Sequence, residues 1–394
     1  MLRSLARGTS ITAVVLAALA LLGLGVPALL RVGSESGSWA VSEKALQVKI
    51  AWKRNSPDLS YFAFAPGGRY FYTAARGGKL SVYSADGKPY YSTTIAGCDR
   101  LALSPNAGWA LAYKCLNPAD STIVFLDSQG HAFWKTSVTG AVWSADVCAI
   151  ADGARFVVGT GKRCAYVYDL TKTGRRYKWW RTPGVVVSIN IDPNGNNVSY
   201  GTWQDSAIAR ANIDGSELWR RDLDAASLHY LQALDSSDRM LLRSVPNCRA
   251  ADGEFCVLDA SGGVVWRGEL NAASRARVIC SPNGRFVCLG LVQSMEHKGK
   301  SVCENHAALY DESGKKLWEK GSMFFQAEPL AVTSSGEAIL TDARGGLFIV
   351  RGKGELESSV KLPGSVVRST QSHDGSALLV QCSDGNLCKL DILQ

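Results

Sequence analysis

A short pattern of apolar and polar positions recurs along the chain. An apolar run ends at Asp, a polar segment that contains Gly follows, and a second apolar run ends in Trp. The three clearest copies keep the same offsets and are Phe125–Trp134, Val257–Trp266 and Leu309–Trp318. Asp can accept hydrogen bonds from the backbone two residues further on, and Gly readily adopts the positive φ that a tight turn needs. Each copy therefore predicts a β-hairpin.

The Trp that ends each copy is too large for one small hairpin to bury, so a neighbouring copy must cover it. Stacked units of this kind, with four strands each, are typical of β-propeller blades. The Trp residues expected to dock adjacent blades are Trp52, Trp134, Trp179, Trp219, Trp266 and Trp318.

Each unit also begins with a turn signal between two strands. The eight signals are Ala65–Gly68, Ser104–Gly108, Ala151–Gly153, Asp192–Gly195, Ser236–Asp238, Ser281–Gly284, Ser334–Gly336 and His373–Gly375. Seven intervals separate Gly67 from Gly375 and average about 44 residues, which is the period of a propeller blade. We expect an all-β, eight-bladed propeller of four-stranded antiparallel blades. Seven blades is the alternative, because the fifth and seventh units are weak.

The last unit lacks an outer strand. Its three strands are predicted at Val366–Gln371, Ala377–Cys382 and Leu387–Asp391, and the chain then stops at Gln394. The segment Leu46–Lys53 has the missing form. We expect it to pair with the last unit and to close the ring, which removes exposed sheet edges.

The N-terminal segment differs from the rest of the chain. Arg3 and Arg7 precede Ile11–Leu30, an uncharged stretch long enough to span a bilayer as a helix. Residues 1–32 are predicted to be a transmembrane anchor or a signal segment, residues 33–45 a flexible tether and residues 46–394 the propeller. The length favours an uncleaved anchor, and the positive flank favours a propeller outside the cytoplasm, periplasmic or extracellular. A cleaved segment would give a secreted protein.

The repeat resembles the quinoprotein-like (PQQ-like) β-propeller repeat, in which a turn of Asp and Gly followed by Trp docks adjacent blades. The resemblance runs from Leu46 to the end of the chain. In that family the quinoprotein alcohol dehydrogenases carry two adjacent cysteines at the cofactor site, and no two cysteines are adjacent here. The resemblance is nearer to the non-enzymatic eight-bladed propellers that scaffold envelope proteins outside a membrane. It implies a scaffold without a cofactor.

Eleven cysteines agree with an oxidising compartment. No Cys-x-x-Cys occurs, so a zinc site is not expected. Four pairs flank predicted hairpins and are candidate disulfides: Cys98 with Cys115, Cys248 with Cys256, Cys280 with Cys288, and Cys382 with Cys388. The alternative is buried free thiols that act as small hydrophobes.

The loops between second and third strands are rich in basic residues. All such loops emerge on one face of a propeller, and they carry Arg76, Lys114, Arg163, Trp203, Arg249, Lys298 and Arg344. The net charge of +8 agrees with affinity for an acidic protein segment or an anionic envelope polymer. The alternative is a set of solvated loops in a basic protein. A further basic and aromatic stretch, Arg175–Arg181, is expected to be a docking strand, with stacking on sugars or bases as the alternative.

No catalytic or metal-binding set can be assembled from these residues. We therefore expect a non-catalytic, membrane-tethered, extracytoplasmic propeller that binds another envelope or membrane protein, or an envelope polymer. The alternative is a propeller enzyme, either a quinoprotein-type oxidoreductase or a lactonase. No nucleic-acid partner is expected.

Overall fold

A computed structural model describes residues 46–115, 120–223, 227–233, 239–246, 254–269, 273–297, 300–322 and 328–393. These ranges contain thirty-two β-strands in eight separate four-stranded sheets. Within them, no helix has the length and apolar character needed to cross a bilayer. The predicted anchor Ile11–Leu30 and the predicted tether lie outside the described residues.

The first four blades follow one another along the chain. Blade 1 contains β2 (Leu59–Phe64), β3 (Tyr70–Ala75), β4 (Lys79–Ser84) and β5 (Pro89–Thr94). Blade 2 contains β6 (Arg100–Leu103), β7 (Trp109–Tyr113), β8 (Ser121–Asp127) and β9 (Ala132–Val138). Blade 3 contains β10 (Val142–Ile150), β11 (Gly153–Thr160), β12 (Cys164–Thr171) and β13 (Gly174–Arg181). Blade 4 contains β14 (Val185–Ile191), β15 (Asn197–Trp203), β16 (Ala207–Asn212) and β17 (Glu217–Asp222).

The last four blades continue the series. Blade 5 contains β18 (Ser227–Ala233), β19 (Met240–Pro246), β20 (Glu254–Leu258) and β21 (Val264–Glu269). Blade 6 contains β22 (Ala273–Cys280), β23 (Val287–His297), β24 (Lys300–Tyr310) and β25 (Lys316–Ser322). Blade 7 contains β26 (Glu328–Val332), β27 (Ala338–Thr341), β28 (Gly346–Arg351) and β29 (Glu355–Lys361). Blade 8 contains β30 (Val366–Gln371), β31 (Ala377–Cys382), β32 (Asn386–Leu393) and β1 (Gln47–Asn55).

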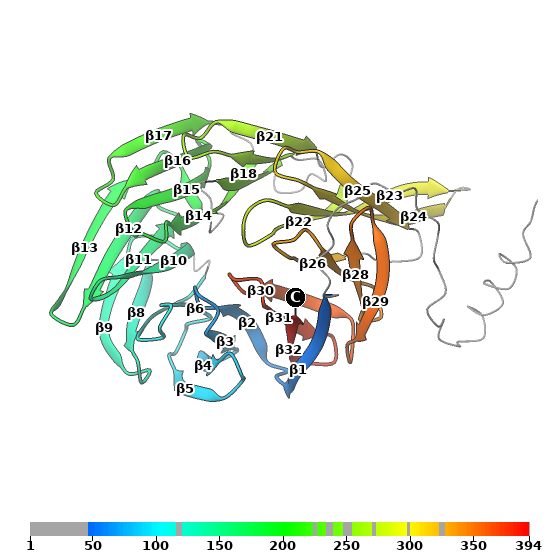
Figure 1. Cartoon of the computed structure of the whole chain (residues 1–394). Helices are drawn as coiled ribbons and strands as arrows, with labels where there is room; N and C mark the ends of the chain where they lie inside the picture. Colours follow the sequence, from blue (N-terminus) through cyan, green and yellow to red (C-terminus); the bar gives the residue numbers. More distant parts are fainter. Residues whose placement is uncertain are drawn as a thin grey trace, which may run out of the picture. The chain divides into compact units, whose positions relative to one another are not determined.

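The eight blades form a closed ring. Each sheet is an antiparallel meander with the first strand innermost, and Figure 1 shows strands such as β10, β14 and β30 around the centre. β1 pairs with β32, from Gln47 opposite Leu393 to Asn55 opposite Asn386, so the N-terminal strand completes the last blade. This confirms eight blades rather than seven, and it confirms the predicted closure.

The hairpin between third and fourth strands follows the chemistry that the repeat predicts. In blade 6, Asp311 Oδ1 accepts hydrogen bonds from the backbone amides of Ser313 at 2.9 Å and Lys315 at 3.1 Å. Gly314 has a φ of 82°. Because a side chain in this region of φ is strained, the sequence needs Gly there. Asp259 and Gly262 form the same turn in blade 5, where Gly262 has a φ of 79°.

The docking Trp of one blade lies on the turn glycine of the next. A Cβ placed on Gly87 would lie 2.8 Å from Trp52, one on Gly262 2.8 Å from Trp219, and one on Gly314 2.7 Å from Trp266. The missing glycine side chain therefore creates the flat seat on which the indole packs. Gly354 of blade 7 differs, because a Cβ there would lie 2.7 Å from the Lys320 side chain and 3.2 Å from the Cβ of Trp318 rather than on its indole.

Blade 2 uses a different contact, because Gly174 of blade 3 has nothing within 4 Å of an added Cβ. Trp134 stacks on Phe125 of its own blade at a ring-centroid distance of 4.7 Å and meets Tyr168 of blade 3 at 5.6 Å. Arg175 of blade 3 lies over the indole, with its guanidinium carbon 5.0 Å from the ring centroid.

The prediction of Trp179 as a docking residue is wrong. Its side chain is 53% exposed, whereas its neighbour Trp180 lies against Gly215 of blade 4, 2.9 Å from an added Cβ. Adjacent residues of a strand point to opposite faces of the sheet. Only one of the two Trp residues can therefore face the next blade.

Three of the four predicted disulfides, Cys98–Cys115, Cys280–Cys288 and Cys382–Cys388, are absent, because these six cysteines are free thiols. Cys288 pairs across the hairpin with Ile279, one position before Cys280, so the two thiols lie on opposite faces of blade 6. Cys115 is not bonded to Cys98 and donates a weak hydrogen bond to the Trp143 carbonyl at 3.6 Å.

The other two candidate pairs give different outcomes. Cys248 lies outside the described residues, and Cys256 is a buried thiol. Cys382 and Cys388 lie on one face of blade 8 with their thiols hydrogen-bonded to each other, and they are not joined. The alternative of buried free thiols holds for Cys98, Cys148, Cys164, Cys288, Cys382 and Cys388, whereas Cys115 and Cys280 are partly exposed free thiols.

Candidate functional site

The loops between second and third strands all emerge at one end of the blades, because every blade has the same meander order. We call this end the loop face. It carries Arg76 from blade 1, Lys114 from blade 2, Arg163 from blade 3, Trp203 from blade 4 and Arg344 from blade 7. Arg249 and Lys298, which were expected on the same face, lie outside the described residues. The structure thus brings five of the seven predicted binding residues to one face.

The cations on the loop face are not equivalent. Arg163 forms an ion pair of 2.6 Å with Asp205 of blade 4, and it also donates to the Pro183 carbonyl at 3.2 Å. Arg76, Lys114 and Arg344 are exposed and have no carboxylate within 4.0 Å among the described residues. Their charge is available to a partner, whereas that of Arg163 is partly neutralised.

Trp203 has an aromatic neighbour that the sequence did not reveal. Trp143, near the start of β10, lies with its ring centroid 6.2 Å from that of Trp203, and both side chains are partly exposed. Trp143 is the second residue of β10, directly after the loop that joins the outer strand β9 to β10, and loops of this kind also emerge on the loop face. The two rings form an apolar patch beside the Arg163–Asp205 pair.

A cluster of cations and aromatic rings lies where the inner strands of blades 1, 2 and 8 begin. The guanidinium carbon of Arg100 lies 4.4 Å from the ring centroid of Tyr61, and that of Arg368 lies 5.9 Å from the same centroid. Arg368 also donates to the Ser60 carbonyl at 2.6 Å. Burial raises the pKa of Tyr61, which keeps its hydroxyl protonated at neutral pH. This cluster adds positive charge at the loop-face end of the inner strands.

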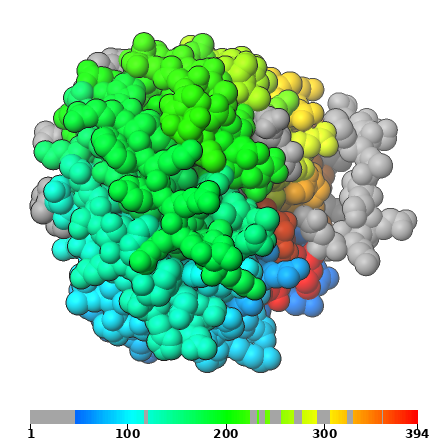
Figure 2. Space-filling view, turned by 90° about the vertical axis from the view of Figure 1, so that its left-hand side faces the viewer, coloured from blue at the N-terminus to red at the C-terminus, as the bar shows by residue number. Residues whose placement is uncertain are grey.

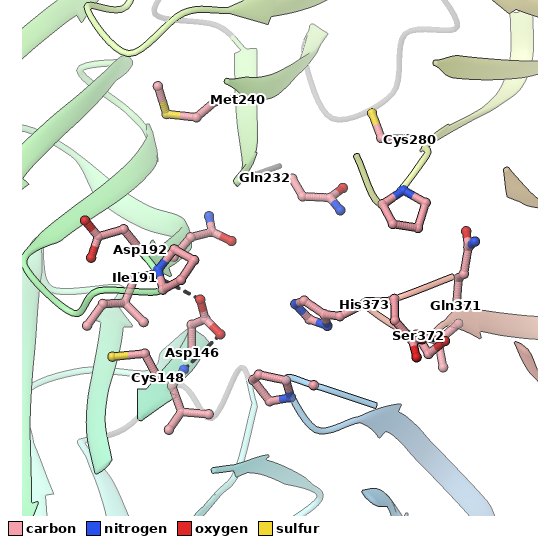
Figure 3. A pocket seen from close by; sticks show the side chains of 18 of the residues that line it. Asp146, Cys148, Ile191, Asp192, Gln232, Met240, Cys280, Gln371, Ser372 and His373 are labelled. Carbon is pink, nitrogen blue, oxygen red and sulfur yellow. Dashed lines mark hydrogen bonds between the residues drawn. The ribbon is translucent and has the colours of Figure 1, made fainter. Parts of the chain in front are cut away.

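A cavity of about 1070 Å³ lies at the centre of the ring. Figure 3 shows Asp146 of blade 3, Gln232 of blade 5 and His373 of blade 8 pointing into it. Turn residues at the ends of the inner strands, including Pro66, Pro105 and Pro193, complete the wall. These turns lie at the end of the blades opposite the loop face.

The charged groups in the cavity wall join neighbouring blades. Asp146 accepts a hydrogen bond from the Ile191 amide of blade 4 at 3.0 Å. Arg277 of blade 6 forms an ion pair of 2.9 Å with Glu328 of blade 7. These contacts fix the inner strands against one another. Arg277 itself lines the wall of the cavity.

Cavity thiols are poor nucleophiles at neutral pH. Burial raises the pKa of Cys148 to about 12 and that of Cys280 to about 12. A thiolate is the reactive form, so both side chains stay protonated and unreactive. The part of the chain that the structure describes contains no group of three His, Cys, Asp or Glu side chains placed to hold a metal ion.

No protein-family model matches the chain, and no curated protein matches its sequence. Solved structures do match. BamB from Moraxella catarrhalis has a TM-score of 0.59 and 16% identity, covering 87% of this chain and 97% of BamB. The Dos1 propeller has a TM-score of 0.64 and 12% identity, covering 87% of this chain and 95% of that one. The propeller domain of Cps50 (Swd1) from Myceliophteria thermophila has a TM-score of 0.56 and 10% identity, covering 88% and 100%. Identities this low show a shared propeller fold.

Proposed function

We propose that this protein is a non-catalytic binding propeller whose loop face takes an acidic segment of an envelope or membrane protein, or an anionic envelope polymer. The observation that carries the proposal is the convergence on one face of Arg76, Lys114 and Arg344, exposed and without ion-pair partners among the described residues. Cations grouped in this way attract an anionic partner and orient it before contact.

The proposed partner also meets an apolar contact. Partly exposed aromatic rings are enriched at the centres of protein interfaces, and Trp143 and Trp203 lie together on the loop face. We propose that the Trp pair anchors the partner and that the surrounding cations set its orientation. The resemblance of the repeat to envelope-scaffold propellers supports a protein-binding role, and the likeness to BamB supports the propeller fold on which that role rests.

We further propose that residues 1–32 tether the propeller to a membrane, with the propeller outside the cytoplasm. The support is the sequence of that segment, in which two arginines precede an uncharged apolar run. Protease protection in sealed cells or vesicles tests this part of the proposal separately.

The test of the loop face compares two triple variants of the full-length protein. Arg76→Glu/Lys114→Glu/Arg344→Glu reverses three charges on the loop face. Lys172→Glu/Lys315→Glu/Lys353→Glu reverses three charges in turns between third and fourth strands, at the opposite end of the blades. Each protein is immobilised and exposed to envelope extract. A ligand retained by wild type and by the control variant, and lost from the loop-face variant, is the expected result. Equal retention by both variants would overturn the proposal.

The central cavity favours a second candidate function, binding of a small molecule. Ligand-binding pockets occupy about 300–1,000 Å³ and combine apolar walls with a few convergent polar groups, which describes this cavity. Asp146, Gln232 and His373 would contact the ligand. A thermal-shift screen tests this candidate. A ligand that raises the melting temperature of wild type should not raise that of Gln232→Ala.

A further inference from the structure

We propose that β13, the outer strand of blade 3, is a docking edge to which an extended acidic segment of a partner protein adds as a fifth strand. This site lies on the rim of the propeller and does not depend on the loop face. Figure 1 shows β13 at the periphery, and in Figure 2 this side of the ring faces the reader.

The edge of β13 is geometrically distinct among the outer strands. Its eight residues pair with β12 in unbroken register, from Gly174 opposite Thr171 to Arg181 opposite Cys164. The outer strands of the other seven blades each carry a register shift. Bulges of this kind twist an edge away from regular pairing, and proteins use them to block strand addition. Blade 3 lacks that protection.

The hairpin that precedes β13 explains the difference. In blade 6, Leu309 pairs with Trp318 and Tyr310 with Lys316, so one extra residue lies on the outer strand. In blade 3 only Lys172 and Thr173 separate the paired residues Thr171 and Gly174. A two-residue hairpin keeps the strands in register without a bulge. The open edge is therefore a consequence of the local sequence.

The side chains of β13 specify an acidic partner. Four cations, Arg175, Arg176, Lys178 and Arg181, lie within the strand, and all four are exposed. Among the described residues none of the four has a carboxylate within 4.0 Å. The segment from Lys172 to Arg181 contains no Asp or Glu. An acidic strand laid along this edge gains charge pairs, whereas a second copy of β13 is repelled.

Two exposed aromatic side chains add contact area. Tyr177 is 62% exposed and Trp179 is 53% exposed, and they lie on the same face of β13. Each stacks beside the ring of its cross-strand partner on β12: Tyr177 beside Tyr168 at 6.1 Å and Trp179 beside Tyr166 at 6.4 Å. Blade docking does not use Trp179, since Trp180 fills that role. The pair is therefore available to an added strand, whose side chains would pack on it.

Strand addition has a backbone requirement that simple charge attraction lacks. An added strand exchanges amide and carbonyl hydrogen bonds with the open edge, while its side chains determine selectivity. A peptide with the same charges and no amide hydrogens should therefore fail to bind. This difference separates a strand-addition site from a general basic patch.

The experiment measures fluorescence anisotropy of a labelled eight-residue peptide of alternating Glu and Val or Thr, titrated with the full-length protein. Two companion peptides are used, one fully N-methylated on its backbone and one with Lys in place of Glu. Two protein variants accompany wild type. Arg176→Glu/Arg181→Glu reverses charges on β13, and Lys353→Glu/Lys361→Glu makes the same change at the bulged outer strand of blade 7.

Binding of the acidic peptide is expected to weaken at least tenfold in the β13 variant and less than twofold in the blade 7 variant. The N-methylated and Lys peptides are expected not to bind. Hydrogen exchange of the amides of β13 should slow only with the acidic peptide. Equal binding of the N-methylated peptide would reduce the site to a charge patch and overturn the proposal. Equal loss in both variants, or no binding, would overturn it as well.

Discussion

Gly314 of blade 6 lies directly against the indole of Trp266 of blade 5. A Cβ on Gly314 would lie 2.7 Å from Trp266 Cγ, closer than any side chain can approach. The glycine also has a φ of 82°. The left-handed backbone conformation and the contact with the neighbouring blade thus each require glycine at this position. Their contributions to stability can be measured separately.

Gly314→Ala is expected to lower the free energy of unfolding by roughly 3 kcal/mol, from left-handed backbone strain and from overpacking against the indole. Gly67 is the matched control, because it has a φ of 85° and nothing within 4 Å of an added Cβ. Gly67→Ala should cost only about 1 kcal/mol, the strain alone. Urea denaturation measures both values. Equal losses would show that the contact with Trp266 contributes nothing.

Trp180→Ala should destabilise the protein much more than Trp179→Ala. Trp180 fills the seat at Gly215, and removal of a large packed aromatic costs about 3 kcal/mol. Trp179 is 53% exposed, so its loss should cost less than about 1 kcal/mol. Chemical denaturation of the two variants checks the order. A reversed order would restore Trp179 as the docking residue.

Alkylation in denaturant without a reductant should label at least eight of the eleven cysteines, namely Cys98, Cys115, Cys148, Cys164, Cys280, Cys288, Cys382 and Cys388, which are free thiols. Intact-mass measurement counts the labels. In the folded protein at pH 7.5, Cys288 and Cys148 should resist labelling, because both are buried and burial raises the pKa of each thiol. Fewer than eight labels in denaturant would show that disulfides form among these cysteines.

Stability should fall at alkaline pH because of the buried thiols. Burial raises the pKa of Cys98 from 9.0 to about 11 and that of Cys148 from 9.0 to about 12. A group whose pKa is raised by folding contributes its full stability below the unfolded value and loses it as the pH rises toward the folded value. The free energy of unfolding should therefore be level below pH 8 and decline above pH 9.

Cys148→Ala isolates one of these groups. Between pH 8 and pH 10 the free energy of unfolding should fall less in this variant than in wild type, by about 1 kcal/mol. One group titrating in the unfolded state alone contributes about 1.4 kcal/mol per pH unit. Urea titrations at both pH values supply the comparison. The same decline in both proteins would assign the alkaline loss to other groups.

Much of the fold could be predicted because its determinants are local. The turn pattern around Asp311 and Gly314 specifies a hairpin, and eight turn signals at a regular spacing specify eight blades. The closure by β1 followed from the missing outer strand after Asp391. The packing of Trp52, Trp180, Trp219 and Trp266 on glycines of the next blade was not predicted, because it joins residues about forty positions apart.

The wrong predictions for the docking Trp of blade 3 and for the cysteines of blade 6 have one physical cause. In both, the strand register determines the face of the sheet on which a side chain lies. A bulge of one residue reverses the face of every later side chain in a strand. The register of blade 3 decides between Trp179 and Trp180, and the register of blade 6 separates Cys280 from Cys288. Neither register follows from composition or spacing. The pairing of Arg163 with Asp205, and of Trp143 with Trp203, depends on loops of neighbouring blades in the same way.

Binding of a partner on the loop face can be located by a hydrogen-exchange footprint. The full-length protein is compared with and without the ligand retained in the envelope capture. We expect slower exchange only in the loops between second and third strands, around Arg76, Arg163 and Arg344. Unchanged exchange in these loops, with slower exchange in the turns at the opposite end of the blades, would contradict it.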